Sequence, residues 1–242
     1  MTTKPRVEQG GGVLPRRFEI FDQMLALFPG GRLIDLGAGH GMFAQRAAKA
    51  GWVVTAVDAR PDRFPKDSSV KWLTQDVRLV DLSPYDVIAC LGLFYHLTPE
   101  DQVSLLRRAG GKPIIIDTHV DNGLSTHPLS ERMVVHGYEG SWYREPGELT
   151  SSWGNRHSFW PTPESLYQML RECGYPVVVS AQPWVKPDRT FFLALPANFV
   201  PSRPGLGFTV THAAERGTRQ VVRRARRVAR RVKRALARAR NR

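Results

Sequence analysis

The chain has 242 residues, of which 42% are hydrophobic and 24% are charged. These proportions are ordinary for a folded domain, and they exclude a wholly disordered chain, a collagen-like chain and a disulfide-stapled mini-protein. No apolar run approaches the ~20 residues that a membrane-spanning helix needs. The first residues lack the apolar segment of a secretory signal, and the two cysteines, Cys90 and Cys173, suit a reducing compartment. We therefore expect a cytoplasmic protein.

The net charge of +13 is concentrated at the C-terminal end of the chain. Residues 216–242 contain twelve Arg, one Lys and no acidic residue, so that residues 1–215 hold 22 basic and 22 acidic residues. Small apolar side chains recur at steps of three and four, which predicts a basic amphipathic helix over 215–242 after a linker over 201–214. Such a helix suits an anionic surface, either the inner face of a membrane or nucleic-acid phosphates. A solvated tail is the third alternative.

Predicted helices and strands alternate in the first half of the chain, after a flexible segment over 1–13. Apolar residues at helical spacing predict a first helix over 15–28, which ends at a Pro-Gly-Gly sequence. Two prolines interrupt residues 60–69, so any helix there is short. The remaining elements are a helix over 41–50 and strands over 32–36, 52–57, 70–74 and 85–91.

Two helices in the second half begin with the same Thr-Pro-Glu sequence. Threonine caps the helix, proline occupies its first position and the acid lies in its first turn. Strands alternating with helices predict an α/β fold, with a mostly parallel open sheet covered on both faces and a terminal hairpin that adds an antiparallel strand. The elements are helices over 98–109 and 162–174 and strands over 112–117, 177–185 and 190–195, whereas residues 120–160 have no clean period.

A glycine-rich turn follows the first strand, in the segment LIDLGAGHG over residues 33–41. Glycines let the backbone approach a ligand closely, and parallel sheets bind ligands at the carboxyl ends of their strands. The dinucleotide fingerprint needs glycine where this chain has Met42, and no Gly-Lys-Ser/Thr follows, so that fingerprint and a P-loop are both excluded. Asp35, two residues before the first glycine, suits a cationic ligand. The alternative is that Asp35 caps the helix that follows.

Two further carboxylates follow the next two strands. Asp58 ends the second strand, 21 residues after Gly37, in a position from which a carboxylate can accept both hydroxyls of a ribose. Asp76 follows the third strand and can accept from an adenine amino group, while Val77 offers its backbone amide. Ordinary turn or surface aspartates are the alternatives.

Together these features resemble the class I S-adenosylmethionine-dependent methyltransferases. The matching elements are the Asp35–Gly41 turn, Asp58 in VTAVDAR, Asp76-Val77 in TQDV, and the strand YDVIACLGLFYHL. The resemblance covers about residues 14–197 and implies a domain over 14–200 with a Rossmann-like seven-stranded sheet whose last strand is antiparallel. The segment 60–69 departs from the family, which usually has a longer helix there. S-adenosylmethionine is the implied cofactor, held by Asp35, Gly37, Ala38, Gly39, Asp58, Ala59, Asp76, Val77 and Leu91.

Histidines are the candidate catalytic residues. A hydroxyl acceptor must lose a proton, and neutral histidine is suited to take it near pH 7. His96 follows the fourth strand and His119 follows the fifth, and both strand ends face the ligand cleft of this fold. The alternatives are a helix-entry residue for His96 and a backbone-bonded loop residue for His119. Asp117 is a weaker candidate as an oxygen ligand for magnesium.

The segment 120–160 reads as an insertion, and long segments of this kind are often lids or binding loops. Its aromatic rings can stack on a sugar face, stack on a base, or form a satellite core. Its polar side chains can bond the hydroxyls of an acceptor. The aromatic residues are Tyr138, Trp142, Tyr143, Trp153, Phe159 and Trp160, and the polar residues beside them include Glu145, Asn155, Arg156 and His157.

The sequences GLFYHL, DTHV and SFWPTPESL resemble those of small-molecule and sugar O-methyltransferases. We therefore expect methyl transfer to a hydroxyl of a sugar, a polysaccharide precursor or another small molecule. A shorter similarity, at Tyr95-His96, to enzymes that modify the wobble uridine of tRNA leaves an RNA methyltransferase with a nucleic-acid-binding tail as one alternative. A non-catalytic cofactor-binding module is the other.

Overall fold

The computed structural model describes residues 13–123, 129–147, 152–183 and 188–200. The predicted N-terminal segment, linker and basic tail lie outside the described residues. The chain divides into two units, and the unit formed by Met1–Ala26 and Gly30–Phe199 contains every helix and strand below. The other unit is Leu27–Pro29 with Val200–Arg242, of which the structure describes residues 27–29 and 200.

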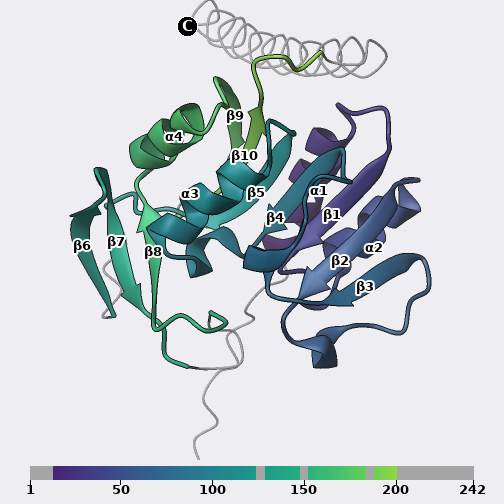
Figure 1. The fold of residues 1–242 in the computed structure, drawn as a ribbon, viewed down its shortest axis with the longest axis horizontal. Coiled ribbons are helices and arrows are strands. Elements are labelled where there is room, and N and C mark those ends of the chain that lie inside the picture. The colour runs from purple at the N-terminus through teal and green to yellow at the C-terminus, as the bar shows by residue number, and fades with distance from the viewer. Residues whose placement is uncertain (1–12, 124–128, 148–151, 184–187, 201–242) are drawn as a thin grey trace, which may run out of the picture. The chain divides into compact units, whose positions relative to one another are not determined.

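A seven-stranded sheet in the order β3-β2-β1-β4-β5-β10-β9 forms the centre of the first unit (Figure 1). The strands β1 to β5 are parallel, and β10 runs antiparallel to both of its neighbours, β5 and β9. The predicted Rossmann-like sheet with an antiparallel C-terminal hairpin is therefore confirmed. The bounds are β1 Arg32–Leu36, β2 Val53–Asp58, β3 Val70–Thr74, β4 Val87–Leu91, β5 Ile114–His119, β9 Val177–Ala181 and β10 Arg189–Leu195.

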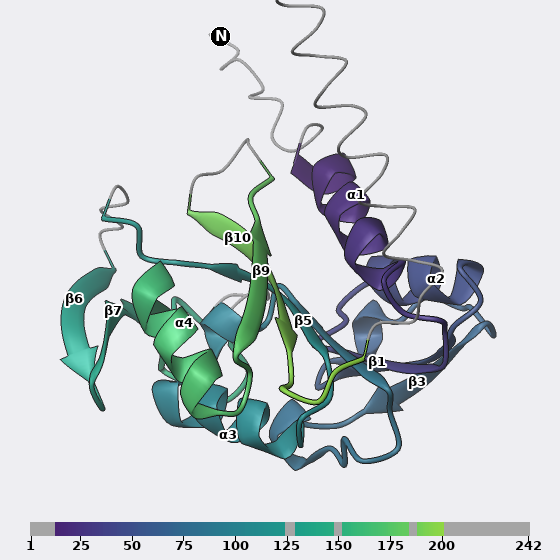
Figure 2. The same ribbon diagram turned by 90° about the horizontal axis from the view of Figure 1, so that it is seen from above.

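Helices cover both faces of this sheet, as Figure 2 shows. On one side lie α1 (Val13–Leu25) and α2 (Met42–Lys49), and on the other lie α3 (Pro99–Arg108) and α4 (Pro163–Glu172). Both helices of the second pair begin as their sequences predict, with a threonine hydroxyl accepting a backbone N–H in the first turn. The helices bury the apolar faces of the central strands, and the fully buried residues include Phe21, Leu33, Ile88, Leu106, Phe191 and Phe192.

Short 3₁₀ turns follow three of the parallel strands at their carboxyl ends. The first turn, η1 (Pro61–Arg63), is the short helix of residues 60–69. The two prolines of that segment predict a short helix. The other two turns are η2 (Val77–Leu79) after β3 and η3 (Phe94–His96) after β4. Together with the glycine turn after β1, these turns place side chains along one edge of the sheet, where parallel sheets bind ligands.

A second, antiparallel sheet lies beside α4 (Figure 1). Most of it falls within residues 120–160, where the apolar residues of the sequence follow neither a helical nor a strand spacing. It consists of β6 (Ser130–Val135), β7 (Tyr138–Arg144) and β8 (His157–Pro161). The regular alternation of a half-buried strand is lost in β7 because small and aromatic residues occupy both of its faces. The insertion is thus built on a folded sheet, with the loop between β7 and β8 reaching toward the edge of the larger sheet.

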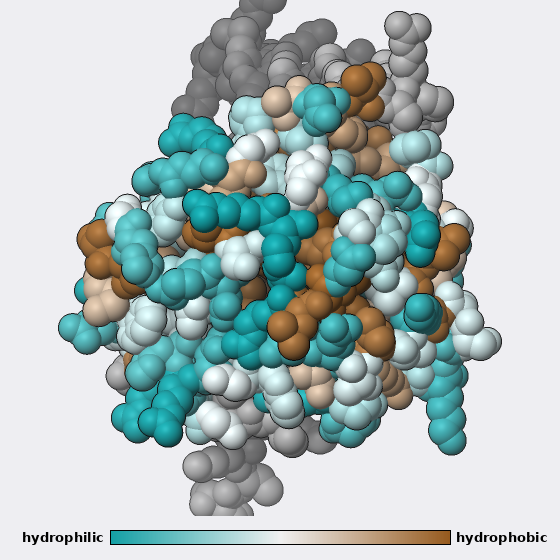
Figure 3. All heavy atoms as spheres, in the orientation of Figure 1, coloured by the Kyte–Doolittle hydropathy of each residue, from teal (hydrophilic) through white to brown (hydrophobic). Residues whose placement is uncertain are grey.

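Within the part of the chain that the structure describes, no helix combines the length and apolar character needed to cross a bilayer. Over the face drawn in Figure 3, hydrophobic residues lie in small groups between hydrophilic and neutral ones. One large apolar side chain that stays exposed is Trp153, at 53% of its surface. Its position matters for the site described below.

The second sheet depends on a glycine in β7, and this dependence can be tested. A Cβ at Gly140 would collide with the backbone carbonyl of Trp160 and would lie 2.8 Å from the Cα of Pro161. Because the backbone of β8 cannot yield as a flexible side chain can, Gly140→Ala should lower the free energy of unfolding by about 3 kcal/mol. Urea denaturation measures the change.

The control is Gly137→Ala, in the turn between β6 and β7. Gly137 has a φ of +84° and no neighbour within 4 Å of an added Cβ, so only backbone strain of about 1 kcal/mol is expected. Equal losses for the two variants would contradict the proposed collision.

Candidate functional site

The glycine turn after β1 brings its backbone close to the loop after β4. Gly37 has a φ of +67°, and a Cβ there would lie 2.9 Å from the Cβ of Leu93. The turn is fixed to β2 by a hydrogen bond from the Ala38 N–H to the Val57 carbonyl, 3.0 Å long. Glycine is required at position 37 by both conformation and space.

Asp58 lies at the end of β2 and faces this turn. Its two carboxylate oxygens accept the backbone N–H groups of Gly39, at 2.8 Å, and of Arg60, at 2.9 Å. The residue is 8% exposed. Since a carboxylate can accept about four hydrogen bonds, Asp58 keeps capacity for donors on a ligand in the adjoining cavity.

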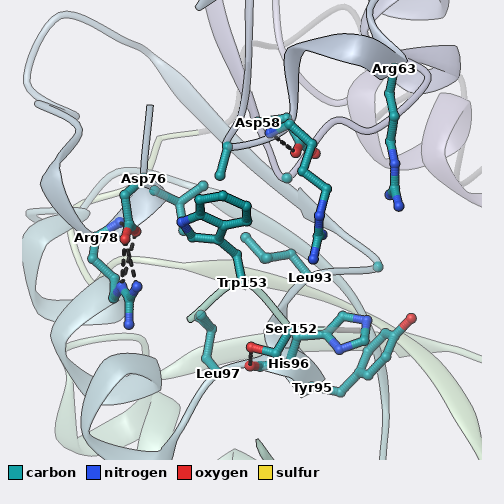
Figure 4. Close-up of a pocket in the computed structure, with 15 residues that line it drawn as sticks. Asp58, Arg63, Asp76, Arg78, Leu93, Tyr95, His96, Leu97, Ser152 and Trp153 are labelled. Carbon is teal, nitrogen blue, oxygen red and sulfur yellow. Dashed lines mark hydrogen bonds and ion pairs between the residues drawn. The ribbon is translucent and has the colours of Figure 1, made fainter. Parts of the chain in front are cut away.

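A cavity of about 240 Å³ opens beside Asp58 at the carboxyl edge of the sheet (Figure 4). Its walls come from the turns after β1, β2, β3 and β4 and from the loop between β7 and β8. Of the predicted cofactor and catalytic residues, the cavity is lined by Gly37, Asp58, Ala59, Asp76, Val77 and His96. The others, Asp35, Ala38, Gly39, Leu91, Asp117 and His119, are outside its lining.

Asp76 lines the cavity and forms an ion pair with Arg78. The Arg78 guanidinium binds its carboxylate through two nitrogens, at 2.6 and 3.0 Å, and the Arg78 backbone N–H donates at 2.9 Å. The side-chain hydrogen bond from Arg78 lowers the pKa of Asp76 below its ordinary value. Asp76 is thus a fixed anion on the wall opposite Asp58, with η2 beginning directly after it.

Asp35 is buried in the sheet, 2% exposed, behind the glycine turn. Its carboxylate accepts the backbone N–H of Ala44, in the first turn of α2. Burial raises its pKa from 3.8 to about 7. The Ala44 contact agrees with the alternative considered from the sequence, in which Asp35 caps the helix that follows, while its contact with the cofactor stays a prediction.

His96, the last residue of η3, is held in place by the insertion. Its Nδ1 lies 2.9 Å from Oε1 of Glu145, whose side chain is 3% exposed. Burial acts to raise the pKa of Glu145, but the hydrogen bond and charge of His96, together with hydrogen bonds from Ser158 and Ser152, leave that pKa below its ordinary value. A carboxylate on Nδ1 fixes the tautomer in which Nε2 is an acceptor.

His119 is engaged at both of its ring nitrogens. Its Nδ1 lies 2.9 Å from Asp188, and its Nε2 lies 3.1 Å from a guanidinium nitrogen of Arg189. Because arginine can only donate, the Nε2 lone pair accepts from Arg189. The ring is also stacked on Trp160, with centroids 4.9 Å apart. This histidine holds β5, β8 and β10 together.

Asp117, the predicted magnesium ligand, is fully buried between two arginines. Arg17 from α1 donates to it at 2.7 Å, and Arg189 from β10 donates to both of its oxygens, at 2.7 and 2.9 Å. Two guanidinium groups already balance its charge, and they repel a divalent cation at the same carboxylate. Among the described residues, no group of three His, Cys, Asp or Glu side chains is arranged to hold a metal ion. The Asp117 contacts therefore point to an ion-pair role.

Comparison with known proteins settles the family. The family model described as "Methyltransferase domain" matches residues 15–180.

The chain belongs to the methyltransferase domain family. The predicted relationship to class I S-adenosylmethionine-dependent methyltransferases is thereby confirmed, and the order of the strands in this methyltransferase domain agrees with it.

Several named proteins are similar to this methyltransferase domain. A ubiquinone biosynthesis O-methyltransferase of Coxiella burnetii is 26% identical over 112 residues, which is 40% of this chain and 47% of that protein. The chain thus spans about half the length of the curated relatives it matches.

The N-terminal domain of EvdMO1 shares the fold in two crystal structures. With SAH bound it has a TM-score of 0.59 at 20% identity, covering 74% of this chain and 79% of that one. In the presence of SAH and D-fucose it has a TM-score of 0.57 at 18% identity, covering 78% and 84%. At these identities the likeness concerns the fold.

Several residues that hold the elements around the candidate site together carry no local signal in the sequence. Arg17 and Arg189 lie 100 and 72 residues from the carboxylate they share. Gln102 is a further residue of this kind. Its fully buried amide donates hydrogen bonds to the carbonyls of Phe94, at 3.0 Å, and of Phe159, at 2.7 Å. It thereby ties η3 to β8. Only the general rule that a buried polar group needs a partner could have suggested them.

The raised pKa of Asp35 predicts a pH-dependent stability. The unfolded carboxyl ionises near pH 3.8 and the folded one near pH 7, so the folded state binds the proton more tightly between these values. The free energy of unfolding therefore falls as the pH rises through this window. Asp35→Asn stays neutral and keeps an acceptor for Ala44, so it should remove the fall.

Urea denaturation at about pH 5 and about pH 8 tests this. The unmodified protein should lose on the order of 3 kcal/mol relative to Asp35→Asn between the two conditions. Glu131→Gln, at an exposed position of β6, serves as the control and should follow the unmodified protein. Parallel pH dependence of all three proteins would show that Asp35 titrates normally.

Proposed function

We propose that this methyltransferase domain transfers a methyl group from S-adenosylmethionine to a hydroxyl of a small molecule, with His96 as general base. The observation that carries the proposal is the His96–Glu145 pair on the wall of the cavity that Gly37, Asp58 and Asp76 also line. The proposed nucleoside-binding residues and the oriented imidazole of His96 line the same cavity. Methyl transfer to a hydroxyl requires the cofactor and the proton acceptor to be this close.

The residues of the cavity suit the cofactor. The glycine at position 37 leaves space that a Cβ would fill, so the cofactor chain can pass close to the backbone. Asp58 offers its remaining lone pairs to the ribose hydroxyls, and Asp76 offers an acceptor for the adenine amino group. The bound cofactor supplies an electrophilic methyl group on a sulfonium, and the protein supplies position and a proton acceptor.

His96 is the better supported of the two histidine candidates. Glu145 accepts from Nδ1–H, so Nε2 can take the proton of an acceptor hydroxyl as the methyl group is transferred. The imidazolium that forms is stabilised by the ionised Glu145 beside it. His119 already uses Nε2 as the acceptor of a hydrogen bond from Arg189, so its place in the proposal is structural.

An aromatic group next to His96 suits a sugar or another ring-shaped acceptor. Tyr95 contacts the His96 ring, with centroids 4.2 Å apart, and Trp160 stacks between Tyr143 and His119. Aromatic faces present apolar surface to the C–H face of a sugar while leaving its hydroxyls to polar groups. The EvdMO1 structure determined with D-fucose present has a related fold.

The remaining predictions keep the status they have from the sequence. The membrane- or nucleic-acid-binding tail lies outside the described residues, and the RNA-modifying alternative, which also draws on Tyr95-His96, stays a prediction. The non-catalytic alternative, the magnesium requirement and the cytoplasmic location stay predictions as well.

The role of Asp58 can be tested by binding alone. Asp58→Asn removes the charge that strengthens hydrogen bonds to the ribose hydroxyls, so the affinity for S-adenosylhomocysteine should fall about 10- to 100-fold. Isothermal titration calorimetry measures the dissociation constant. Asp62→Asn, at an exposed position of η1, is the control and should bind as tightly as the unmodified protein. Unchanged affinity in Asp58→Asn would remove the proposed ribose contact.

The role of His96 requires a transfer assay. His96→Asn should lower methyl transfer from labelled S-adenosylmethionine to a panel of sugars and phenols about 10²- to 10⁴-fold, with the affinity for S-adenosylhomocysteine changed less than about threefold. His136→Asn, an exposed histidine in the turn after β6, is the control. His119→Asn should mainly lower the melting temperature, because it breaks the contacts with Asp188 and Arg189. Full activity in His96→Asn would reject it as the base.

A further inference from the structure

Trp153 occupies an unusual place for a residue of the insertion. It lies in the loop between β7 and β8, yet it lines the same cavity as Asp58 and Asp76. Figure 4 shows its indole between these two aspartates. In the proposed function, Asp58 binds the ribose and Asp76 binds the adenine, so the indole stands at the junction of the two.

The indole is exposed although it points into a cavity. Trp153 is 53% exposed. A flat ligand that covers so large an aromatic ring removes apolar surface from water, and this burial stabilises the complex. The Arg60 guanidinium lies over the ring at 5.3 Å from its centroid. That contact links the loop to the turn after β2, and the 53% exposure of Trp153 leaves surface for a second planar group to cover.

Hydrogen bonds on both sides of Trp153 fix its position. The Ser152 hydroxyl donates to the His96 carbonyl at 2.7 Å, and the Ser152 N–H donates to Glu145 at 3.1 Å. The Asn155 amide donates to the same His96 carbonyl at 3.1 Å and accepts from Arg78, also at 3.1 Å. The loop is therefore attached both to the proposed base and, through Arg78, to Asp76.

We propose that Trp153 is the adenine-stacking residue of this protein, with Ser152 and Asn155 as positioning residues. This inference rests on the proposed function for the identity of the cofactor. The adenine ring is planar and apolar on its faces, as the open side of the indole requires, and its amino group is then directed to Asp76. The insertion thereby contributes a cofactor contact in addition to its place beside the acceptor.

Calorimetry with two ligands tests the stacking. Trp153→Ala should weaken the binding of S-adenosylhomocysteine about 10-fold or more, while Trp153→Phe should stay within about threefold of the unmodified protein. S-ribosylhomocysteine, which lacks the adenine, should bind Trp153→Ala and the unmodified protein equally. Circular dichroism spectra confirm that the variants fold.

Two matched variants sharpen the experiment. Asn155→Ala removes a positioning contact without touching the ligand, so it should weaken S-adenosylhomocysteine binding about two- to fivefold. Quenching of tryptophan fluorescence by S-adenosylhomocysteine should persist in Trp142→Phe, which changes another tryptophan of the insertion, and should be lost in Trp153→Phe.

The outcomes separate this inference from the proposed function. If the unmodified protein does not bind S-adenosylhomocysteine, the proposed function fails. If it binds and Trp153→Ala binds equally well, or loses both ligands equally, the stacking role is wrong. Tighter binding by Trp153→Ala would mean that the indole occupies the adenine position, and this also overturns the inference.

Discussion

The buried carboxylate of Asp117 holds together the parts of the molecule that form the site. Arg17 reaches it from α1 and Arg189 reaches it from β10, so the N-terminal helix and the last strand are both attached to the end of β5. Removing one partner from such a pair leaves an uncompensated buried charge, which costs several kcal/mol. The same arrangement affects His119. The terminal guanidinium nitrogen of Arg189 that does not bind Asp117 donates a hydrogen bond to Nε2 of His119. The ion pair thus engages His119, whereas His96 is paired with Glu145.

The insertion completes a site that the larger sheet only begins. The Rossmann-like part provides the glycine turn, Asp58 and Asp76, which are the proposed contacts to the nucleoside of the cofactor. The loop between β7 and β8 adds Glu145 behind the imidazole and Trp153 in the cavity wall. In the proposed function, cofactor recognition and acceptor chemistry meet on this loop, and its sequence is where relatives with other acceptors would be expected to differ.

The sequence predicts the fold well and the site in part, for physical reasons. Caps, glycine turns and apolar strands are local patterns, and they placed the helices, the parallel strands and the terminal hairpin. The place of Asp58 beside the cavity could be predicted because it follows from a position at a strand end. The contacts of Asp117 and His119 could not be foreseen, because they depend on partners that only the folded chain brings within reach. The strands of the insertion escaped notice because β7 is packed on both faces and shows no period of two.

The order of the strands has a consequence for how the protein forms. β10, the last strand to be synthesised, inserts between β5 and β9, and it carries Arg189. Until that strand is in place, Asp117 lacks one of its two cations and β5 presents an unpaired edge. Completion of the sheet therefore depends on contacts distant in sequence, and such pairings form slowly. A chain that ends before residue 189 would lack both the Arg189 partner of Asp117 and the strand that pairs with β5, so the site would lose its support from that side.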